Sequence, residues 1–129
     1  MTDPIADFII RIKNALLARK KEVVLPHSKI KESIANILQK EGYVAEVLVR
    51  EAQPVSELVV TLKYVGKLPA VNGVKRLSTP GRRLYAPVHS IPRTLNGYGI
   101  TIVSTSKGIM TDTSARKQNV GGELLCQIW

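Results

Sequence analysis

Three consecutive hydroxyl residues, Ser104, Thr105 and Ser106, stand directly after a short apolar run and are followed by Lys107 and Gly108. Short hydroxyl side chains beside a glycine leave backbone amides open to close approach, and the hydroxyls themselves can bind phosphate, ribose and base edges. Lys107 adds a mobile positive charge for phosphate. These residue types suit contact with nucleic acid. An ordinary solvated loop, a phosphate-cradling loop and a nucleophile on a turn are the alternatives.

The nucleophile interpretation would combine Ser104 or Ser106 with His89 and Asp112. The flanking pattern T-S-K-G lacks the G-x-S-x-G elbow that exposes a serine on a strained turn. A histidine and an aspartate occur somewhere near a serine in most chains. We therefore expect no enzyme and no catalytic residue.

Phosphate loops and metal sites need spacings that this sequence does not contain. The pattern G-x-x-x-x-G-K-[ST] is absent, and the GYG at 97–99 precedes a predicted strand instead of following one. Two histidines and one cysteine give no metal-ligand spacing. We expect no metal, no cofactor and no small-molecule substrate.

The charge of the chain is strongly positive and unevenly distributed. Its formal net charge is +9. Residues 1–64 hold 10 Lys and Arg against 8 Asp and Glu, whereas residues 65–129 hold 9 against 2. The second part therefore supplies most of the positive field, which predicts attraction to a polyanion, either nucleic acid or an anionic membrane surface.

Two features bear on the compartment. The apolar stretch 5–18 contains Asp7, Arg11 and Lys13, which makes it too polar for a membrane span or a secretory leader. Cys126 is the single cysteine, so the chain has no internal disulfide, and a small half-buried side chain in a reducing compartment is its simplest reading. We expect a cytoplasmic protein.

Hydrophobic periodicity predicts an α+β fold of two small modules. The first, 1–64, reads as αβαββ, with a helix from Pro4 and a second helix capped by Ser28 and ended by Gly42. Gly, Pro and Asn mark a linker at 65–73. The second module, 74–129, is mostly β with short helices. It is expected to contain strands at 74–77, 83–85, 98–103 and 123–129, a loop from 104, and a helix over 111–119 capped by Thr111 or Asp112.

Four separated segments resemble one known family in the same order. They are DPIADFIIRIKNA, SKIKESIANIL with EGY, VKRLSTPGRRLY, and VSTSKGIMTDTSARKQNVGGELLCQIW. The chain resembles the small-subunit ribosomal protein eight family, in its bacterial form, over essentially its whole length.

This resemblance implies a specific role. Members bind a helix in the central domain of small-subunit ribosomal RNA, help to assemble that subunit and lie beside other small-subunit proteins. Many bacterial members also bind a similar hairpin in their own operon messenger and repress its translation. A free-standing RNA-binding regulator outside the ribosome is the alternative function.

The resemblance also assigns residues. Ser104, Thr105, Ser106, Lys107 and Gly108 match the main RNA contact of the family. Tyr85 matches a base-contacting or stacking aromatic residue, and Glu123 lines the same pocket, where its carboxylate could orient the loop or accept from a base amino group. Further candidates for RNA contact are Arg82, Arg83, Lys29 and Lys31.

The sequence departs from the family pattern near two of these positions. Thr79 stands where many members have lysine, and Ala86 and Pro87 stand where basic residues are common. Both departures imply weaker peripheral phosphate binding than is typical of the family. Neither affects the hydroxyl residues.

Overall fold

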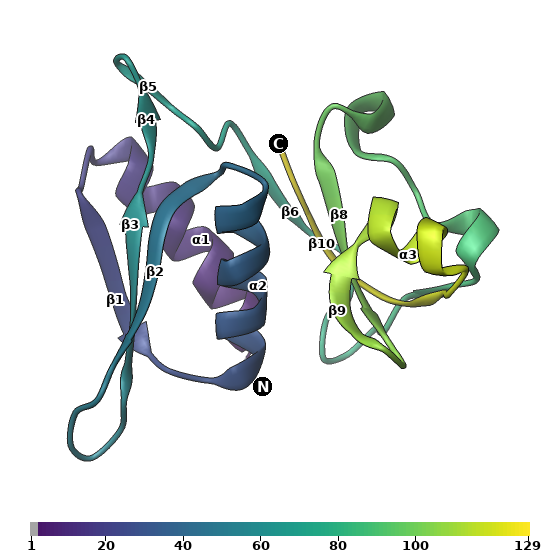
Figure 1. Ribbon diagram of the computed structural model, residues 1–129, viewed down its shortest axis with the longest axis horizontal. Helices are drawn as coiled ribbons and strands as arrows, with labels where there is room; N and C mark the ends of the chain where they lie inside the picture. The colour runs from purple at the N-terminus through teal and green to yellow at the C-terminus, as the bar shows by residue number, and fades with distance from the viewer. Residues whose placement is uncertain (1–2) are drawn as a thin grey trace. The chain divides into compact units, whose positions relative to one another are not determined.

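The computed structural model describes residues 3–129, apart from the side chains of 95 and 96. The chain separates into two compact units, Pro4–Asn72 and Gly73–Trp129 together with Asp3 (Figure 1). Each unit combines helices with antiparallel strands. The predicted α+β class is confirmed.

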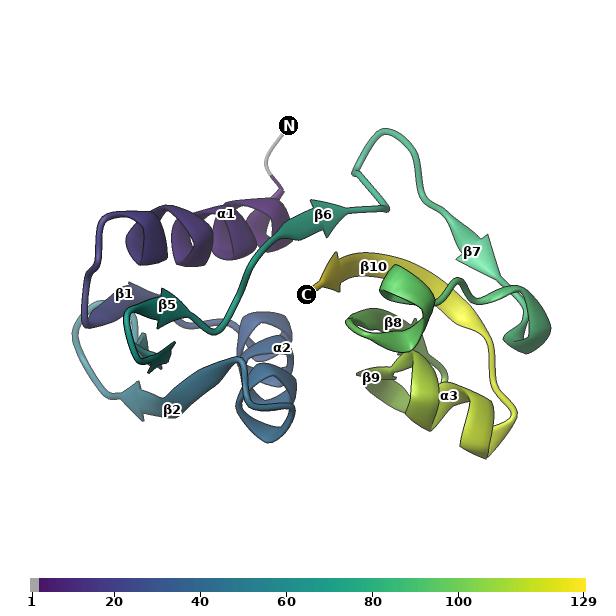
Figure 2. The same cartoon turned by 90° about the horizontal axis from the view of Figure 1, so that it is seen from above.

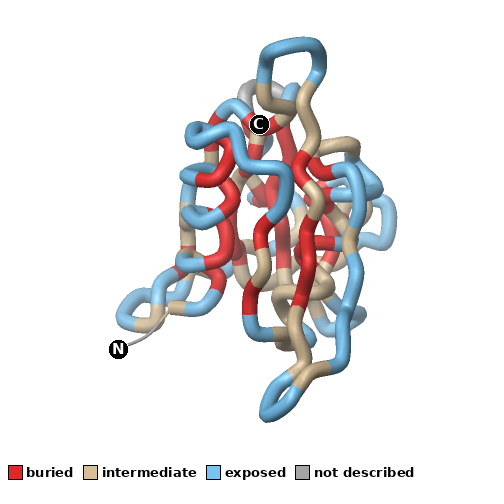
Figure 3. The backbone as a smooth tube through the Cα atoms, turned by 90° about the vertical axis from the view of Figure 1, so that its left-hand side faces the viewer, coloured by how far each residue is buried: buried red, intermediate tan, exposed pale blue. Residues whose placement is uncertain are grey.

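The N-terminal unit holds a three-stranded antiparallel sheet in the order β1-β3-β2, with β3 in the centre. Helix α1 packs against β1 and α2, while α2 packs against β2 (Figure 2). The tips of its two hairpins, 53–55 and 65–68, are exposed (blue in Figure 3). Its elements are α1 Pro4–Leu17, β1 Glu22–Pro26, α2 Lys29–Lys40, β2 Val44–Arg50, β3 Glu57–Leu62, β4 Tyr64–Val65 and β5 Leu68–Pro69.

Local sequence signals account for both long helices. The apolar positions predicted for one face of α1, among them Phe8, Ile9 and Ile12, are buried, and burying each such side chain contributes about 1.5–3 kcal/mol. The Ser28 hydroxyl accepts a hydrogen bond from the Lys31 amide and caps α2. Gly42 follows α2 with a φ of +84°. These predictions are confirmed.

Arg19, just after the end of α1, adopts a backbone conformation in which glycine is more common. Arg19 has a φ of +58°, a conformation that costs a non-glycine residue about 1–2 kcal/mol. Its guanidinium donates to the Lys67 carbonyl and lies 5.7 Å from the centre of the Tyr64 ring. The Tyr64 hydroxyl in turn donates to the Lys20 carbonyl at 2.6 Å. The β4–β5 hairpin is thereby fixed to the end of α1, an anchor that a glycine at position 19 would lack.

The C-terminal unit is built around one long strand. Strand β10 pairs with β6 and β7 and also with β8, which pairs with β9. Helix α3 packs against β8 and β9, and Ile91, Val103, Met110, Ala115 and Leu124 form a buried cluster. The elements are β6 Val74–Arg76, β7 Tyr85–Ala86, the 3₁₀ turns Val88–Ser90 and Thr94–Gly97, β8 Ile100–Thr105, β9 Gly108–Thr111, α3 Asp112–Gln118 and β10 Gly122–Ile128.

Asp3 belongs to this unit through an ion pair with Arg76. The Arg76 guanidinium lies 3.0 Å from the Asp3 carboxylate and also donates to the Leu125 carbonyl. Cys126 is fully buried nearby, not half-buried as expected. Burial raises the pKa of the Cys126 thiol to about 12, so the thiol is protonated at neutral pH and is a poor nucleophile.

The prediction of a loop from residue 104 was wrong. Strand β8 starts at Ile100, two residues later than expected, and runs to Thr105, while residues 108–111 form the additional strand β9. The physical reason is that neighbours on both sides, β10 and β9, complete the hydrogen bonds of these polar residues. No helix within residues 3–129 is long and apolar enough to cross a membrane.

Candidate nucleic-acid interface

Strands β8 and β9 meet in a tight turn, which we call the tip and define as residues 104–108. Thr105 and Gly108 are the last paired residues, and Ser106 and Lys107 form the turn between them. Gly108 has a φ of +112°, a backbone conformation that favours glycine because it has no Cβ. Ser106 and Lys107 are exposed.

The three hydroxyls of the tip have different roles. The Thr105 hydroxyl donates to the Gly108 carbonyl at 2.8 Å and accepts from the Lys107 amide at 3.1 Å. It closes the turn. Within the described chain, the side chains of Ser104 and Ser106 form no hydrogen bond. These two hydroxyls are therefore available to a ligand.

Strand pairing brings three candidates from separate strands into one line, which we call the row. Glu123 of β10 is opposite Tyr85 of β7 and also opposite Ser104 of β8. Residues opposite each other in a sheet project from the same face. The row therefore presents a phenol, a carboxylate and a hydroxyl on one surface beside the tip, and Tyr85 is 70% exposed.

Glu123 has a protein partner. Its carboxylate lies 3.2 Å from the Arg83 guanidinium, and its side chain is 17% exposed. A pair so close to solvent contributes about 0–1 kcal/mol to stability. Its main effect is to hold Arg83 against β10 next to the row. Arg82 is exposed, and its backbone bonds to Thr79 across the turn.

Lys29 and Lys31 lie in the N-terminal unit and are not part of the row. Lys29 is exposed at the first turn of α2. The Lys31 amine donates to the Pro26 carbonyl at 3.1 Å.

Two consecutive glycines let the strands of the row approach each other. A Cβ on Gly122 would lie 2.1 Å from the Ser104 carbonyl oxygen, and one on Gly121 would lie 2.4 Å from the Ala86 carbonyl oxygen. No side chain fits at such distances. Sequence reasoning did not single these glycines out, although a glycine inside a strand is a known sign of close backbone approach.

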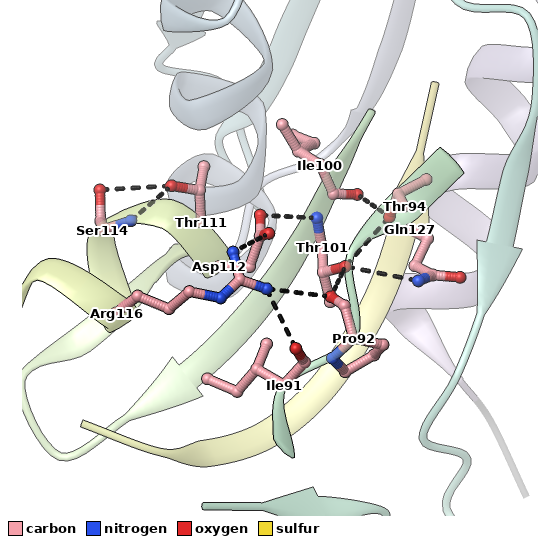
Figure 4. Close-up of polar contacts among 10 residues, drawn as sticks. All are labelled: Ile91, Pro92, Thr94, Ile100, Thr101, Thr111, Asp112, Ser114, Arg116 and Gln127. Carbon is pink, nitrogen blue, oxygen red and sulfur yellow. Dashed lines mark hydrogen bonds and ion pairs between the residues drawn. The ribbon is translucent and has the colours of Figure 1, made fainter. Parts of the chain in front are cut away.

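A buried polar network supports the base of the hairpin (Figure 4). Asp112, the first residue of α3, accepts from the Thr101 amide at 3.2 Å and from the Arg116 guanidinium at 2.6 Å. Arg116 also donates to the Ile91 carbonyl at 3.0 Å. Strand β9 ends at Thr111, so the carboxylate of the next residue, Asp112, takes the hydrogen bond of the Thr101 amide. This bond connects α3 to β8.

The segment before β8 joins this network through two threonines. The Thr101 hydroxyl donates to the Pro92 carbonyl at 3.0 Å, and the Thr94 hydroxyl donates to the Ile100 carbonyl at the same distance. The helix cap is Thr111, whose hydroxyl accepts from the Ser114 amide. Asp112 has the different role described above. Of the two caps left open by the sequence, the structure selects Thr111.

The geometry also bears on the two alternative kinds of site, a serine nucleophile and a metal site. Because Asp112 is bound to Arg116 and Thr101, its carboxylate is not placed to orient His89 for a nucleophile. In residues 3–129, no three His, Cys, Asp or Glu side chains gather as a metal site would require.

Comparison with known proteins identifies the family. The family model described as Ribosomal protein S8 matches residues 3–129. The chain belongs to the ribosomal protein S8 family. Proteins called small ribosomal subunit protein uS8 are 53% identical in Opitutus terrae, 53% in Desulfovibrio desulfuricans and 54% in Dictyoglomus thermophilum. Each match covers 100% of this chain and 98–100% of the relative.

Membership of the S8 family confirms the resemblance read from the four sequence segments. The family is a structural component of the ribosome and not an enzyme family. The serine-nucleophile alternative is thereby excluded. The assignment of individual residues to RNA contact stays a prediction.

In this S8 family member the Thr105 hydroxyl closes the turn, whereas the hydroxyls of its two neighbours do not. A substitution tests this structural role of Thr105. We expect Thr105→Val to lower the free energy of unfolding by about 1 kcal/mol, because both hydrogen bonds of the hydroxyl are lost. Thr105→Ser keeps the hydroxyl and should stay near the parent. Urea unfolding of both variants measures the difference. Equal stabilities of the valine and serine variants would show that the hydroxyl does not hold the turn.

Proposed function

We propose that this small-subunit ribosomal protein binds small-subunit ribosomal RNA through the tip and the row. Membership of the S8 family establishes the ribosomal role. The RNA contact is supported by the exposed groups of the C-terminal unit and by its excess of positive charge, since residues 65–129 hold 9 basic against 2 acidic residues.

The observation that carries the proposal is the difference among the three tip hydroxyls. The Thr105 hydroxyl is fully engaged in closing the turn, whereas the side chains of Ser104 and Ser106 flank it with no hydrogen bond inside the described residues. Two hydroxyls at fixed positions beside Lys107 suit hydrogen bonds to base edges or ribose and one contact with a phosphate.

Tyr85 adds a stacking surface to these polar groups. Its ring is exposed and stands beside Glu123, which is itself opposite Ser104. In regular RNA helices the base edges are hard to reach, so sequence is read where bases are displaced from the helix. A ring, a carboxylate and a hydroxyl in one line suit such a displaced base.

The finer parts of the proposal follow from the family resemblance. The RNA target is a helix in the central domain, binding promotes assembly of the subunit in the cytoplasm, and neighbouring small-subunit proteins contact the bound chain. The same surface would accept a messenger hairpin of matching shape, so repression of the chain's own operon belongs to the proposal.

A titration of serine variants tests the proposal. We expect Ser104→Ala or Ser106→Ala to weaken binding to the cognate ribosomal RNA by about 1–3 kcal/mol, because an RNA polar group buried at the interface loses its partner. Nuclease footprinting on total ribosomal RNA first defines the protected fragment, and the same titration on the operon messenger tests the second target.

Two controls make this experiment decisive. A scrambled duplex should bind the serine variants as it binds the parent, because the net charge is unchanged. Thermal unfolding should also be unchanged, since neither hydroxyl has a partner in the described chain. If both alanine variants bind the cognate RNA like the parent, the tip is not the reading surface.

A further inference from the structure

The N-terminal unit gathers unneutralised positive charge at one end. Helices α1 and α2 both end there, and the β4–β5 hairpin lies beside them (upper part of Figure 1). We call this region the basic end. Its cations are Arg19, Lys20, Lys21, Lys40, Lys63 and Lys67.

Specific contacts bring these residues together from segments far apart in sequence. Arg19 donates to the Lys67 carbonyl, and Tyr64 donates to the Lys20 carbonyl, so the hairpin is fixed to the last turn of α1. The amine of Lys63 lies 3.7 Å from where a Cβ on Gly42 would be, which places it at the end of α2. The cluster is therefore a property of the folded unit and not of one charged run.

The charge balance of the basic end leaves a surplus. The same end also contains three carboxylates, Glu22, Glu41 and Glu46, since Glu22 and Glu46 both lie opposite Thr61 of β3. The C-terminal ends of two helices add the equivalent of about one further negative charge. None of the six cations forms an ion pair within residues 3–129, whereas Arg11, Arg50, Arg76, Arg83 and Arg116 are each paired with a carboxylate. About two positive charges remain for a partner.

The chemistry of the cluster indicates which partner. Five of the six cations are lysines, which act as mobile point charges and suit phosphate contacts that do not depend on base sequence. The Tyr64 ring is half-buried, and the Arg19 guanidinium lies over one of its faces. The basic end therefore suits a nucleic-acid backbone and lacks the groups that read bases.

We propose that the basic end binds the phosphates of a second RNA segment, distinct from the one contacted by the tip. This goes beyond the proposed function, which places RNA contact on the C-terminal unit alone. Leu17, Val65 and Leu68 are also exposed in these segments, so an acidic protein segment with apolar side chains is the competing occupant that the experiment must separate.

Tethered cleavage on the full chain tests this proposal. An iron chelate is attached to the cysteine of one of four variants: Lys21→Cys, Lys67→Cys, Lys107→Cys or the control Lys13→Cys. Each labelled variant is then bound to small-subunit ribosomal RNA at a saturating concentration. Cys126 does not compete for the label because it is fully buried and its pKa is raised to about 12. We expect positions 21 and 67 to cut one RNA segment, position 107 to cut another, and position 13 to cut neither strongly.

Each alternative outcome has a definite meaning. If position 107 cuts the RNA and positions 21 and 67 cut no more than position 13, the basic end faces solvent or a protein, and the proposal is overturned. Cuts from 21 and 67 confined to the segment cut from 107 would also overturn it. If positions 21 and 67 cut the RNA but position 107 does not, the proposed function is wrong while the basic end still binds RNA.

An affinity measurement provides an independent readout. Lys21→Glu and Lys67→Glu should each weaken binding to small-subunit ribosomal RNA about tenfold, and each should reduce the salt dependence of log affinity by roughly 0.7–0.9. Lys13→Glu makes the same charge change at an exposed position of α1 and should stay within threefold. Equal losses in all three variants would mean that only the net charge matters. Unchanged RNA affinity combined with lost binding of an alternating Glu-Leu peptide would assign the surface to a protein.

Discussion

Gly122→Ala should destabilise the protein by about 3 kcal/mol or more and abolish specific RNA binding. The added methyl group would lie 2.1 Å from the Ser104 carbonyl oxygen, and that oxygen belongs to the backbone of the paired strand. A flexible side chain could rotate away, but a ladder carbonyl cannot, so β10 and β8 must separate. Glu123 and Ser104 would then lose their common line. Urea unfolding and titration with the cognate RNA measure the two effects.

Gly81→Ala is the matched control for this substitution. No heavy atom lies within 4 Å of a Cβ at Gly81, and its φ is not positive. We expect its stability to equal or slightly exceed that of the parent, because alanine reduces the entropy of the unfolded chain. If Gly122→Ala unfolded at the same urea concentration as Gly81→Ala, close approach of β10 and β8 would not be required.

Asp112→Ala is the second substitution with a large expected effect, a loss of about 3–5 kcal/mol. It leaves the Arg116 guanidinium without its carboxylate in a site where the Asp112 side chain is only 4% exposed. It also removes the acceptor of the Thr101 amide. Thermal and urea unfolding of the full chain measure the loss.

The chain contains a natural control for this ion pair. Asp7 and Arg11 have the same spacing on α1 and lie 3.2 Å apart, but the Asp7 side chain is 56% exposed. Asp7→Ala should therefore cost no more than about 0.5 kcal/mol. Comparable losses at Asp7 and Asp112 would show that burial does not set the value of the pair. Adding Arg116→Met to Asp112→Ala should recover part of the stability, because no buried charge is then left alone.

The parts of the fold that depend on local signals were predictable from the sequence. The apolar face of α1, the Ser28 cap and the turn at Gly42 are each determined by residues within a few positions of one another. Strand β9 was missed for the opposite reason. The residues around Ser106 look like loop residues, and their strand conformation depends on pairing across the hairpin.

The sequence was sufficient to predict which residues belong to the candidate site. It was not sufficient to predict the different role of each residue. The resemblance selected all three tip hydroxyls alike, whereas the structure shows that Thr105 bonds inward and its neighbours do not. That difference follows from side-chain direction, which the sequence does not contain. The i, i+4 spacing of Asp112 and Arg116 could be read from the sequence, but their burial under β8 could not.

The pairing of Asp3 with Arg76 bears on the order in which the chain acquires its structure during synthesis. Asp3 leaves the synthesising ribosome before the whole N-terminal unit, whereas Arg76 and its strand neighbour β10 emerge after that unit. The unit Pro4–Asn72 is contiguous, so all of its residues are synthesised before β10. The second unit combines Asp3 with residues 73–129, so the RNA-binding surface proposed here forms only after β10 has been synthesised.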